Sequence, residues 1–515
     1  MPAIPGQVLD LPQDAPPGPQ ASVSLKLTRI QVEGNVLIDE AELVPLLRSY
    51  QGRTVTLGDL HEATRRITDH YRERGYLLAY AYLPPQTIRD GVVRIAVVEP
   101  RYDRIAISGV SRLKPEQAAR TLGLVPGSPV EQSALERGLL LLDQTPGVRV
   151  AGTLVPGAEP ATTSLDVTLA DTSRLRADLA LDNHGNDYTG RARGLAQASL
   201  DNPFGHGGQL AVNALATERG LLRAGGLNLL SPDIRGGLRA SLYGSRTDYR
   251  LGGAFAGLGQ EGWATQWGVG LGYPVLLHPG RVMNVRLDLM RKAYTQTNTV
   301  VGLDDRSHVN LARLSVNGAF AHASGGMTLG SLSLGRGRLG LDSNDARLAD
   351  ASGPGAAGGF WVGQFQVRRH HLLPADFRLE AGLSGQVASR NLAPGEKFYL
   401  GGPDGVMSYR PGDGGGDAGA LLSLRLARSL PVAGPDRLEA ALVGQYGVVW
   451  QNHARFPGSA TPNHLGLGGV GIELAYQMTE GLSARLDVMR RIGDSPPSIG
   501  TSPRNLLWAR LDYAF

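Results

Sequence analysis

The sequence of 515 residues predicts two copies of a small α+β module, each with the order β-α-α-β-β, followed by a transmembrane antiparallel β-barrel of about sixteen strands. Three observations lead to this prediction. A short strand that ends in glycine occurs twice in residues 1–172. Helical spacing stops near Arg174. Beyond that point apolar and polar residues alternate with a period of two, as in strands with one apolar face.

The composition excludes several classes of function. Cysteine is absent, so disulfides, thiolate metal sites and cysteine nucleophiles are excluded. The net charge is only +4 and no basic block is present, so we expect no nucleic-acid partner. No apolar run reaches the roughly 18 residues of a membrane-spanning helix, but a hydropathy window does not detect the alternating strands of a membrane barrel.

Residues 1–22 form a proline-rich segment that precedes the first module. The segment lacks the basic and apolar parts of a secretory signal, so we expect that the signal has been removed or is not included in this chain. Because proline breaks helix interiors, we expect a disordered linker here, and any helix in this segment would be short, disordered or lost.

The two modules are predicted at residues 23–100 and 101–172. "RIQVEG" (Arg29–Gly34) recurs in the second module as "RIAISG" (Arg104–Gly109). Helix starts are predicted from capping boxes, Thr56 with Asp59 in the first copy and Ser128 with Glu131 in the second, where Pro129 would take the first helical position. The strands that follow the helices are expected at 76–83 and 92–99, and at 148–155 and 164–171.

The segment "RGYLLAYAYLPPQTIRDGVVRIAVVEP" (74–100) resembles the first polypeptide-transport-associated (POTRA) domain of two-partner secretion transporters, the outer-membrane haemolysin secretion/activation family. An unrelated small α+β module is the alternative. The positions that carry the resemblance are Gly75, Tyr76, Leu83, Pro84, Pro85, Gln86, Asp90 and Gly91.

The barrel is predicted over residues 173–515. Segments such as "RVMNVRLDLM" and "GLSARLDVM" have one apolar face and one face with full charges, which suits a wet lumen better than the interior of a soluble sandwich. The strands are near ten residues long, as a tilted membrane crossing requires. The sixteen expected strands begin near Arg174, Arg191, Gln209, Leu221, Arg235, Glu261, Arg281, Ser307, Gly325, Phe360, Phe377, Gly419, Asp436, His464, Leu482 and Asn505.

The last residues, "NLLWARLDYAF", resemble the signal by which bacterial outer-membrane barrels are recognised for insertion. Tyr513 and the terminal Phe515 lie on the same face of the expected strand. An even number of strands returns both ends of the barrel to the periplasm, which would place the two modules there as well.

The resemblance further implies that the glycine-rich connection 388–418 folds back into the lumen. In the family its tip usually reads Val-Arg-Gly-Tyr, and the arginine pairs with an aspartate of strand 13 in a Gly-x-Asp-x-Gly setting. Here the tip is Val406-Met407-Ser408-Tyr409, and Gln445, two residues before Gly447, stands at the aspartate position. Both charges are absent together, which is coherent because one without the other would cost about 3–5 kcal/mol.

Two replacements for this ion pair remain open. Arg410 would reach a lumen carboxylate such as Glu473 or Asp487, or Met407 and Gln445 would make a neutral contact. A flexible external loop is the alternative to a loop inside the lumen. The high glycine content agrees with tight turns and close packing against the wall.

Enzyme and metal signatures are weak, so we expect no catalytic residues, no cofactor and no metal. "GRGRLG" (Gly335–Gly340) and "GGGDAG" (Gly414–Gly419) match a dinucleotide pattern, but neither follows a strand and opens a helix. The pair His370 and His371 has no third ligand at a suitable spacing. Asp404, Asp413 and Asp417 could bind calcium, but we prefer the interpretation that they are solvated loop carboxylates.

The resemblance implies an outer-membrane transporter of a Gram-negative bacterium that exports one large exoprotein. The N-terminal secretion domain of the exoprotein would dock on the POTRA modules through a sheet edge or a helix groove, and the chain would pass unfolded through the barrel. Outer-membrane lipid and the barrel assembly machinery are the other expected partners. An assembly factor for other barrels, which usually carries more POTRA domains, and a passive porin are the alternatives.

Overall fold

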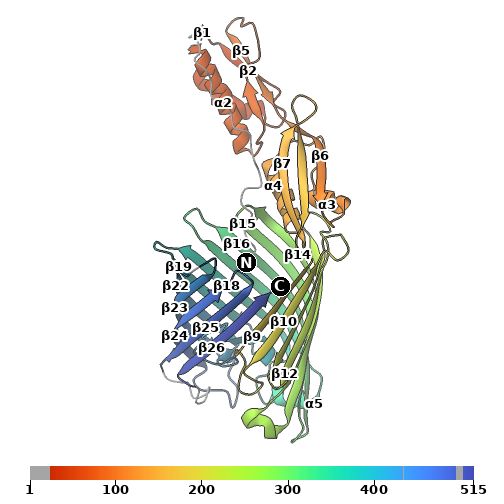
Figure 1. Cartoon of the computed structure of the whole chain (residues 1–515), viewed down its shortest axis with the longest axis vertical. Helices are drawn as coiled ribbons and strands as arrows, with labels where there is room; N and C mark the ends of the chain where they lie inside the picture. Colours follow the sequence, from red (N-terminus) through yellow and green to blue (C-terminus); the bar gives the residue numbers. More distant parts are fainter. Residues whose placement is uncertain (1–23, 433, 494–502) are drawn as a thin grey trace. The chain divides into compact units, whose positions relative to one another are not determined.

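The computed structural model describes residues 24–432, 434–493 and 503–515, so the proline-rich segment 1–22 lies outside the described residues. The chain divides into two compact units, 1–172 and 173–515, whose elements are labelled in Figure 1. Among the described residues, no helix has the length and apolar character needed to span a membrane. Each unit is built around its own sheets and is described by itself.

The first α+β domain has the predicted order with one short strand pair added. The added strands, β1 and β3, pair with each other in antiparallel fashion. The elements are β1 (Ser24–Lys26), β2 (Arg29–Glu33), α1 (Glu40–Leu47), the 3-10 helix η1 (Arg48–Tyr50), β3 (Thr54–Thr56), α2 (Leu57–Glu73), β4 (Tyr80–Tyr82) and β5 (Val92–Val98).

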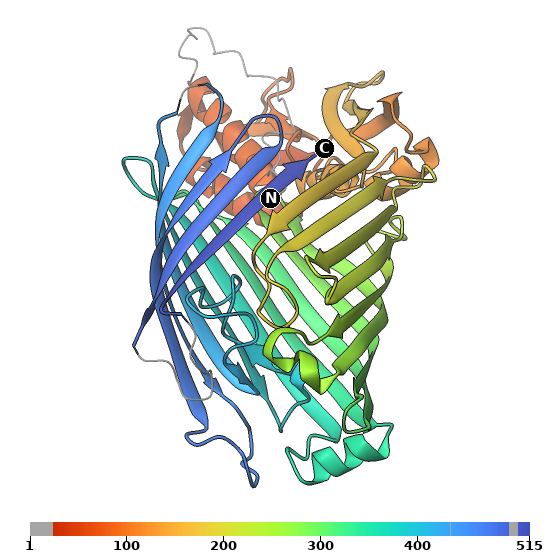
Figure 2. The same cartoon turned by 60° about the horizontal axis from the view of Figure 1, so that its bottom comes forward.

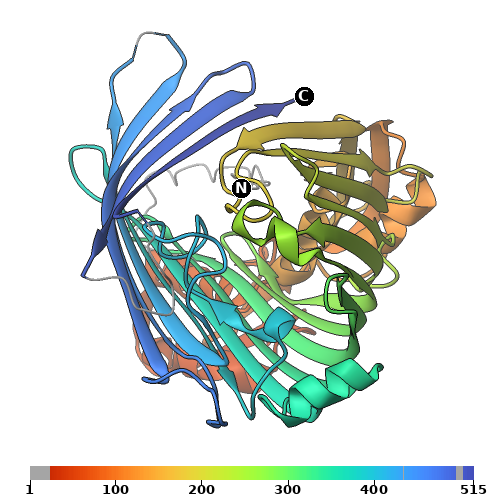
Figure 3. The same ribbon diagram turned by 90° about the horizontal axis from the view of Figure 1, so that it is seen from below.

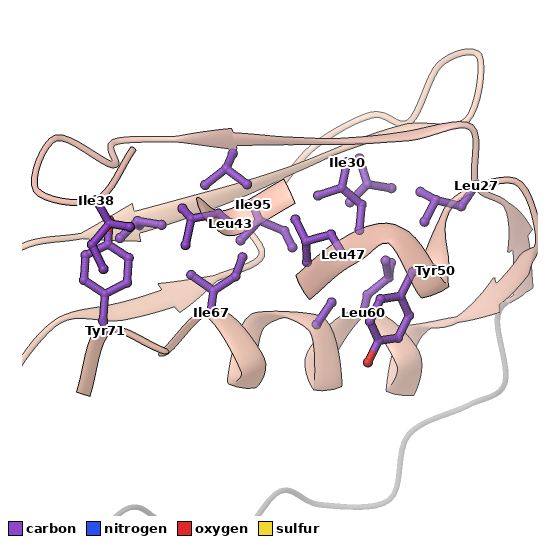
Figure 4. Packing of buried hydrophobic residues seen from close by; sticks show 14 of the residues in the cluster. Leu27, Ile30, Ile38, Leu43, Leu47, Tyr50, Leu60, Ile67, Tyr71 and Ile95 are labelled. Carbon is purple, nitrogen blue, oxygen red and sulfur yellow. The ribbon is translucent and has the colours of Figure 1, made fainter. Parts of the chain in front are cut away.

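The core of this domain lies between the helices and the sheet β2-β5-β4 (Figure 4). Ile67 of α2 and Ile95 of β5 are fully buried. The predicted capping box starts α2, since Thr56 Oγ1 accepts from Asp59 N at 3.2 Å and Thr56 N donates to Asp59 Oδ2 at 2.7 Å. The helix therefore begins where the sequence predicts.

The glutamate that follows β5 connects both sides of this core. Glu99 Oε1 accepts from Tyr71 Oη and Leu37 N, each at 2.8 Å, and from Val36 N at 2.9 Å. Burial and the neighbouring Glu99 carboxylate raise the pKa of Tyr71 above its ordinary value. One carboxylate thus connects α2, the end of the sheet and the turn before α1.

The second domain repeats the arrangement. In the first domain β2 pairs in parallel with the last strand, β5, and β4 is antiparallel to β5. In the second domain the first strand pairs in parallel with the last, and the strand between them in sequence is antiparallel to the last. This common register shows that the two copies share one topology. The elements are β6 (Arg101–Val110), α3 (Pro115–Leu122), α4 (Gln132–Asp143), β7 (Val148–Pro156) and β8 (Thr162–Asp171).

The predicted capping box of the second domain is wrong. Helix α4 begins at Gln132, its N-cap Glu131 makes no side-chain capping bond, and Ser128 Oγ donates to Val125 O at 2.6 Å. Residues 129–130 instead lie beside the start of β6, where Val130 N donates to Pro100 O at 3.2 Å. Pairing with the neighbouring strand has overridden the local helix signal.

The second unit is a closed barrel of sixteen strands, which confirms the predicted fold class. Every strand start lies within four residues of its prediction, because period-two alternation changes sharply at each turn. The strands are β9 (Leu175–Asp182), β10 (Arg193–Asp201), β11 (Gln209–Thr217), β12 (Leu222–Leu230), β13 (Arg239–Arg250), β14 (Gln260–His278), β15 (Arg281–Asn298), β16 (Leu303–Ala321), β17 (Met327–Leu341), β18 (Gly358–Leu372), β19 (Phe377–Ala388), β22 (Ala418–Leu430), β23 (Arg437–Trp450), β24 (His464–Gln477), β25 (Leu482–Ile492) and β26 (Asn505–Ala514).

The wall of the barrel has its apolar side outside. On β15, Leu287 and Leu289 are 45% and 53% exposed, whereas Asp288 between them is only 7% exposed. This inversion is typical of a membrane barrel, where lipid covers the outward apolar band. Several strands are longer than the predicted ten residues, with 19 in β14 and in β16.

The barrel closes at a short seam between β26 and β9. The ladder runs from Arg510 paired with Asp182 to Ala514 paired with Asp178, five pairs in all. Beyond the ladder, the Asn183 side chain substitutes for a strand residue, with Nδ2 donating to Leu507 O at 2.9 Å and Oδ1 accepting from Ala509 N at 2.8 Å. We call the rim with the start of β9 and the end of β26 the terminal rim, and the opposite one the distal rim.

One helix of the second unit is absent from the sequence prediction. Helix α5 (Asn344–Ala351) lies in the distal connection between β17 and β18. Its N-cap is Ser343, whose side chain accepts from Ala346 N at 3.2 Å. The helix is only eight residues long, too short for periodicity to reveal it among strands.

Candidate functional site

The candidate site is the long connection between β19 and β22 together with the lumen wall it contacts. β19 ends at Ala388 and β22 begins at Ala418. The connection starts at the distal rim, and Figures 2 and 3 show its coil inside the barrel wall. It contains the 3-10 helix η3 (Pro394–Glu396) and the two short strands β20 (Phe398–Tyr399) and β21 (Gly415–Gly416).

Two buried lysine–carboxylate pairs hold the parts of this loop next to its tip, which we call its shoulders: residues 392–397 on one side and Asp417 on the other. Lys292 Nζ of β15 lies 2.7 Å from Glu396 Oε1, and Lys397 Nζ lies 2.9 Å from Asp417 Oδ1. The Asp417 carboxylate, 1% exposed, also accepts from Leu392 N at 3.1 Å and His453 N at 2.8 Å. These buried charges are fully paired, which fixes the loop entry to one geometry.

Glycines allow the loop to turn between its shoulders and its tip. Gly402 and Gly412 have φ of +110° and +94°, a region that L side chains rarely adopt. On the wall, a Cβ on Gly447 would overlap the side chain of Leu400, and one on Gly469 would overlap Ser408. Gly447, which the sequence prediction assigned to the wall, therefore leaves space for the loop.

The tip is held by hydrogen bonds between neutral groups. Met407 N donates to Gln445 Oε1 at 2.9 Å, and Trp508 Nε1 of β26 donates to Met407 O at 2.6 Å. Ser408 Oγ donates to Gly468 O of β24 at 3.1 Å. Of the two open replacements, the structure has the contact between Met407 and Gln445.

Apolar packing adds to these hydrogen bonds. Val406 and Tyr409 are 0% and 1% exposed and pack with Leu467 and other apolar residues of the wall. Met407 packs in a second cluster with Val443, Met489 and Trp508. The Arg491 guanidinium lies 5.7 Å from the centre of the Tyr409 ring, a distance typical of a cation–π contact.

The prediction that Arg410 reaches Glu473 or Asp487 is wrong. Arg410 Nη1 lies 2.7 Å from Asp187 Oδ1, in the distal loop between β9 and β10. After Tyr409 the chain turns back, with Arg410 N donating to Asp413 Oδ2 at 2.9 Å, so the side chain points away from the two wall carboxylates. Arg191 also contacts Asp187, and the two guanidinium groups hold the pKa of the Asp187 carboxyl below its ordinary value.

Glu473 and Asp487 belong instead to an ion network on the wall. Arg425 of β22 contacts three carboxylates, Glu473 at 2.6 Å, Glu380 at 3.0 Å and Glu439. Arg485 lies 2.7 Å from Glu473 and 3.1 Å from Asp487. Both predicted partners of Arg410 are therefore already paired.

A cavity of about 570 Å³ separates this network from the loop tip. Pro403, Asp404 and Met407 line it from the loop, and Arg425 and Glu473 line it from the wall. The cavity between the tip and the wall is therefore lined by charged side chains.

Sequence reasoning missed several residues of this arrangement, among them Asp187, Lys397, Arg425 and Trp508. Each lies far along the chain from its partner or within a run that also fits an ordinary strand or loop. The tryptophan in "NLLWARLDYAF" had a usable signal, since its position puts it on the polar face between Leu507 and Ala509.

The residues of the first-domain motif have local structural roles. Gly75 has φ +88° after α2, and its carbonyl accepts from Gln132 N of the second domain at 2.8 Å. Tyr76 packs against Tyr71 with ring centres 6.0 Å apart. Asp90 and Gly91, with φ of 55° and 71°, form the two-residue turn that Asp-Gly favours between antiparallel strands.

Gln86 gives the Leu83-Pro84-Pro85-Gln86 segment a structural role. Strand β4 stops at Tyr82, shorter than the predicted 76–83, and the prolines that follow have no N–H for a ladder. The Gln86 side-chain amide makes the hydrogen bonds that a paired strand would make. Its Nε2 donates to Arg94 O and its Oε1 accepts from Arg94 N, both at 2.7 Å. A side chain thereby completes the edge of β5.

Substituting Gln86 by alanine is expected to open this edge. Two hydrogen bonds disappear, each contributing about 0.5–1.5 kcal/mol, and the Arg94 amide should exchange faster with solvent. Hydrogen exchange of the full-length protein in detergent measures this. Gln31→Ala, an exposed glutamine on β2, is the control and should leave Arg94 unchanged. Equal exchange in the two variants would contradict the role of Gln86.

The C-terminal aromatic residues lie at the seam. The rings of Tyr513 and Phe515 are 4.5 Å apart, edge to face, and Phe515 N donates to Ala177 O at 2.9 Å. Both side chains are exposed on the outside of the barrel. Their role as an insertion signal stays a prediction.

The segments that matched enzyme or metal patterns have other roles. Gly335–Gly340 lies within strand β17, and Gly414–Gly419 leads from the loop into β22, so neither opens a helix. Asp413 accepts from Arg410 N, whereas Asp417 binds Lys397. Within the part of the chain that the structure describes, no three His, Cys, Asp or Glu residues are placed to hold a metal ion.

Comparison with known proteins agrees with this architecture. Residues 25–100 match the POTRA domain of ShlB type. The heme/hemopexin transporter protein HuxB of Haemophilus influenzae is 24% identical over 517 residues, which cover 99% of this chain and 91% of that protein. Among solved structures, CdiB from Escherichia coli has a TM-score of 0.78 at 18% identity, covering 98% of this chain and 93% of that one.

CdiB from Acinetobacter baumannii has the same fold, with a TM-score of 0.71 at 16% identity, covering 96% of this chain and 91% of that one. The family described as haemolysin secretion/activation protein ShlB/FhaC/HecB matches residues 162–475, more than half of the chain. The chain therefore belongs to this family of outer-membrane two-partner secretion transporters, which secrete exoproteins.

Proposed function

We propose that this protein exports one large exoprotein through its own lumen, with the loop tip at residues 402–413 acting as the gate. The observation that carries the proposal is the way the tip is held inside the barrel. It rests on Gln445, Gly468 and Trp508 through hydrogen bonds between neutral groups. Such bonds contribute about 0.5–1.5 kcal/mol each, so an arriving chain can replace them.

The two POTRA modules lie in the periplasm in this proposal and receive the secretion domain of the exoprotein. Their sheets support docking by strand addition, because β7 is an edge strand of nine residues. The passing chain is unfolded, and its folding outside the cell supplies the driving force. The charged lumen wall around Arg425 supports this role, since it gives an extended chain a polar path.

Two further partners belong to the same proposal. Lipid covers the outward leucines of the barrel, such as Leu287 and Leu289. The barrel assembly machinery recognises the end of β26, where Tyr513 and Phe515 present exposed aromatic rings. Neither partner enters the lumen.

Quantitative proteomics of the outer membrane and the culture medium, with and without this gene, tests the proposal. We expect the loss of one very large protein from the cell surface and medium, which would also identify the exoprotein. A broad fall in many barrel proteins would indicate an assembly factor instead. No change in either fraction would favour a passive porin.

A further inference from the structure

The loop tip contacts both sides of the seam that closes the barrel. On one side, Trp508 of β26 donates to Met407 O at 2.6 Å. On the other side, Arg410 pairs with Asp187 in the loop that follows β9. His184 of that same loop packs edge to face on Trp508, with ring centres 5.7 Å apart. These contacts link the tip, β26 and the loop after β9 into one cluster.

The seam is weak next to this cluster. Its ladder has five residue pairs, against eight between β9 and β10 and nine between β25 and β26. Toward the distal rim the ladder is continued by the Asn183 side chain, which bonds Leu507 O and Ala509 N. The tip contacts lie beside the part of the seam that has the fewest backbone bonds.

The loop that carries Asp187 is itself well ordered by its contacts. Asn186 Oδ1 accepts from Tyr188 N at 2.9 Å and Thr189 N at 2.8 Å. Tyr188 packs on Phe255 of the distal loop between β13 and β14, with ring centres 4.8 Å apart. Asp187 is therefore presented to the tip from a fixed position.

The ion pair can open without leaving the Asp187 carboxylate buried and unpaired. Asp187 is 39% exposed at its side chain and keeps Arg191 as a second partner when Arg410 leaves. A partly exposed pair of this kind contributes about 0–1 kcal/mol. The buried pairs at the loop shoulders differ, because Asp417 is 1% exposed and has no comparable access to water.

We infer that Asp187 is the positioning residue of the loop tip, and that the Arg410–Asp187 pair acts with Trp508 as a releasable latch across the seam between β9 and β26. The inference rests on the proposed role of the tip as the gate. It adds that the closed tip also stabilises the distal part of the seam, so the two loosen together when the latch opens.

The test uses full-length protein in planar bilayers, without exoprotein. Arg410→Met and Asp187→Asn remove the same pair, and each is expected to raise the open probability about two- to fivefold, the effect of losing a partly exposed ion pair. The double variant should show no more than either single variant, and Arg410→Lys should restore closure. Arg219→Met, an exposed arginine on another distal loop, is the control and should behave as wild type.

Hydrogen exchange of the same variants separates a latch from a simple plug. In Arg410→Met the Asn183 and Ala509 amides should exchange faster, whereas Gln445→Leu, which loosens the tip on β23, should leave them unchanged. Additive effects in the double variant, or seam exchange unaltered in Arg410→Met, would overturn the inference. Heat-modifiable migration on gels verifies that each variant is folded.

Export of the native exoprotein is measured separately in cells. Arg410→Ala should impair export while the barrel remains inserted. If gene deletion changes no secreted protein, the proposed function fails while the bilayer result on the latch still stands. If export is lost on deletion but the bilayer and exchange results are those of wild type, the latch fails alone.

Discussion

Replacing Arg425 by methionine is expected to prevent the barrel from folding stably. The Arg425 guanidinium contacts Glu473 at 2.6 Å, Glu380 at 3.0 Å and Glu439, on three different strands. Glu473 is only 3% exposed at its side chain. Arg485 still pairs with Glu473, and Arg378 still pairs with Glu380 and Glu439. Removing Arg425, the cation that all three carboxylates share, nevertheless leaves an excess of buried negative charge, which costs about 3–5 kcal/mol.

The folded fraction on unheated gels and the free energy of unfolding in urea measure this effect. Arg428→Met is the matched control on the same strand, because Arg428 is exposed and only stacks on Phe377, 5.1 Å from its ring centre. Arg428→Met should lower the free energy of unfolding by less than about 1 kcal/mol. Adding Glu473→Gln to Arg425→Met should recover part of the loss. A stable barrel in the single variant would show that water enters the network freely.

Replacing Met407 by arginine is expected to expel the loop tip from its site. Met407 is 3% exposed and packs among Val443, Met489 and Trp508. A guanidinium there would be buried next to the neutral Gln445 amide, at a cost of several kcal/mol. We expect channels that are open most of the time, and cells that admit large antibiotics.

Adding Gln445→Asp should return the tip to the lumen. The aspartate would keep an acceptor near Met407 N, now 2.9 Å from Gln445 Oε1, and would supply the missing counter-charge. Gln445→Asp alone should also open the channel, so the double-variant cycle has a coupling energy of about 1–3 kcal/mol. The open probability of the wild type, the two single variants and the double variant is measured in planar bilayers. Purely additive single effects would show that residues 407 and 445 do not face each other in the closed state.

The strands and the order of elements were accessible from sequence because they depend on local pattern. Alternation with a period of two located all sixteen strands, and the Thr56–Asp59 box located the start of α2. The Ser128–Glu131 box failed although it fits the same pattern, since Val130 N bonds Pro100 O and holds the chain beside β6. A local signal is reliable only where no neighbouring strand competes for the same backbone.

Side-chain partners across the lumen were less accessible. The contact of Met407 with Gln445 was one of two open alternatives, because both residues stand at positions that the family pairs. Asp187 was not considered as a partner of Arg410, since 223 residues separate them along the chain. No periodicity connects two loops that meet only after the barrel has closed.

The sequence by itself determined the two α+β domains and the sixteen-stranded barrel, because alternation and capping act over a few residues. The place of the glycine-rich loop inside the barrel came from the resemblance to the family. Only the tertiary structure decided how the loop is held. Lys292, Arg425 and Asp187 each find their carboxylate or guanidinium partner on another strand or loop that the folded barrel brings to one lumen. Ion pairs of this kind depend on distance in space, and the order of residues along the chain does not encode that distance locally.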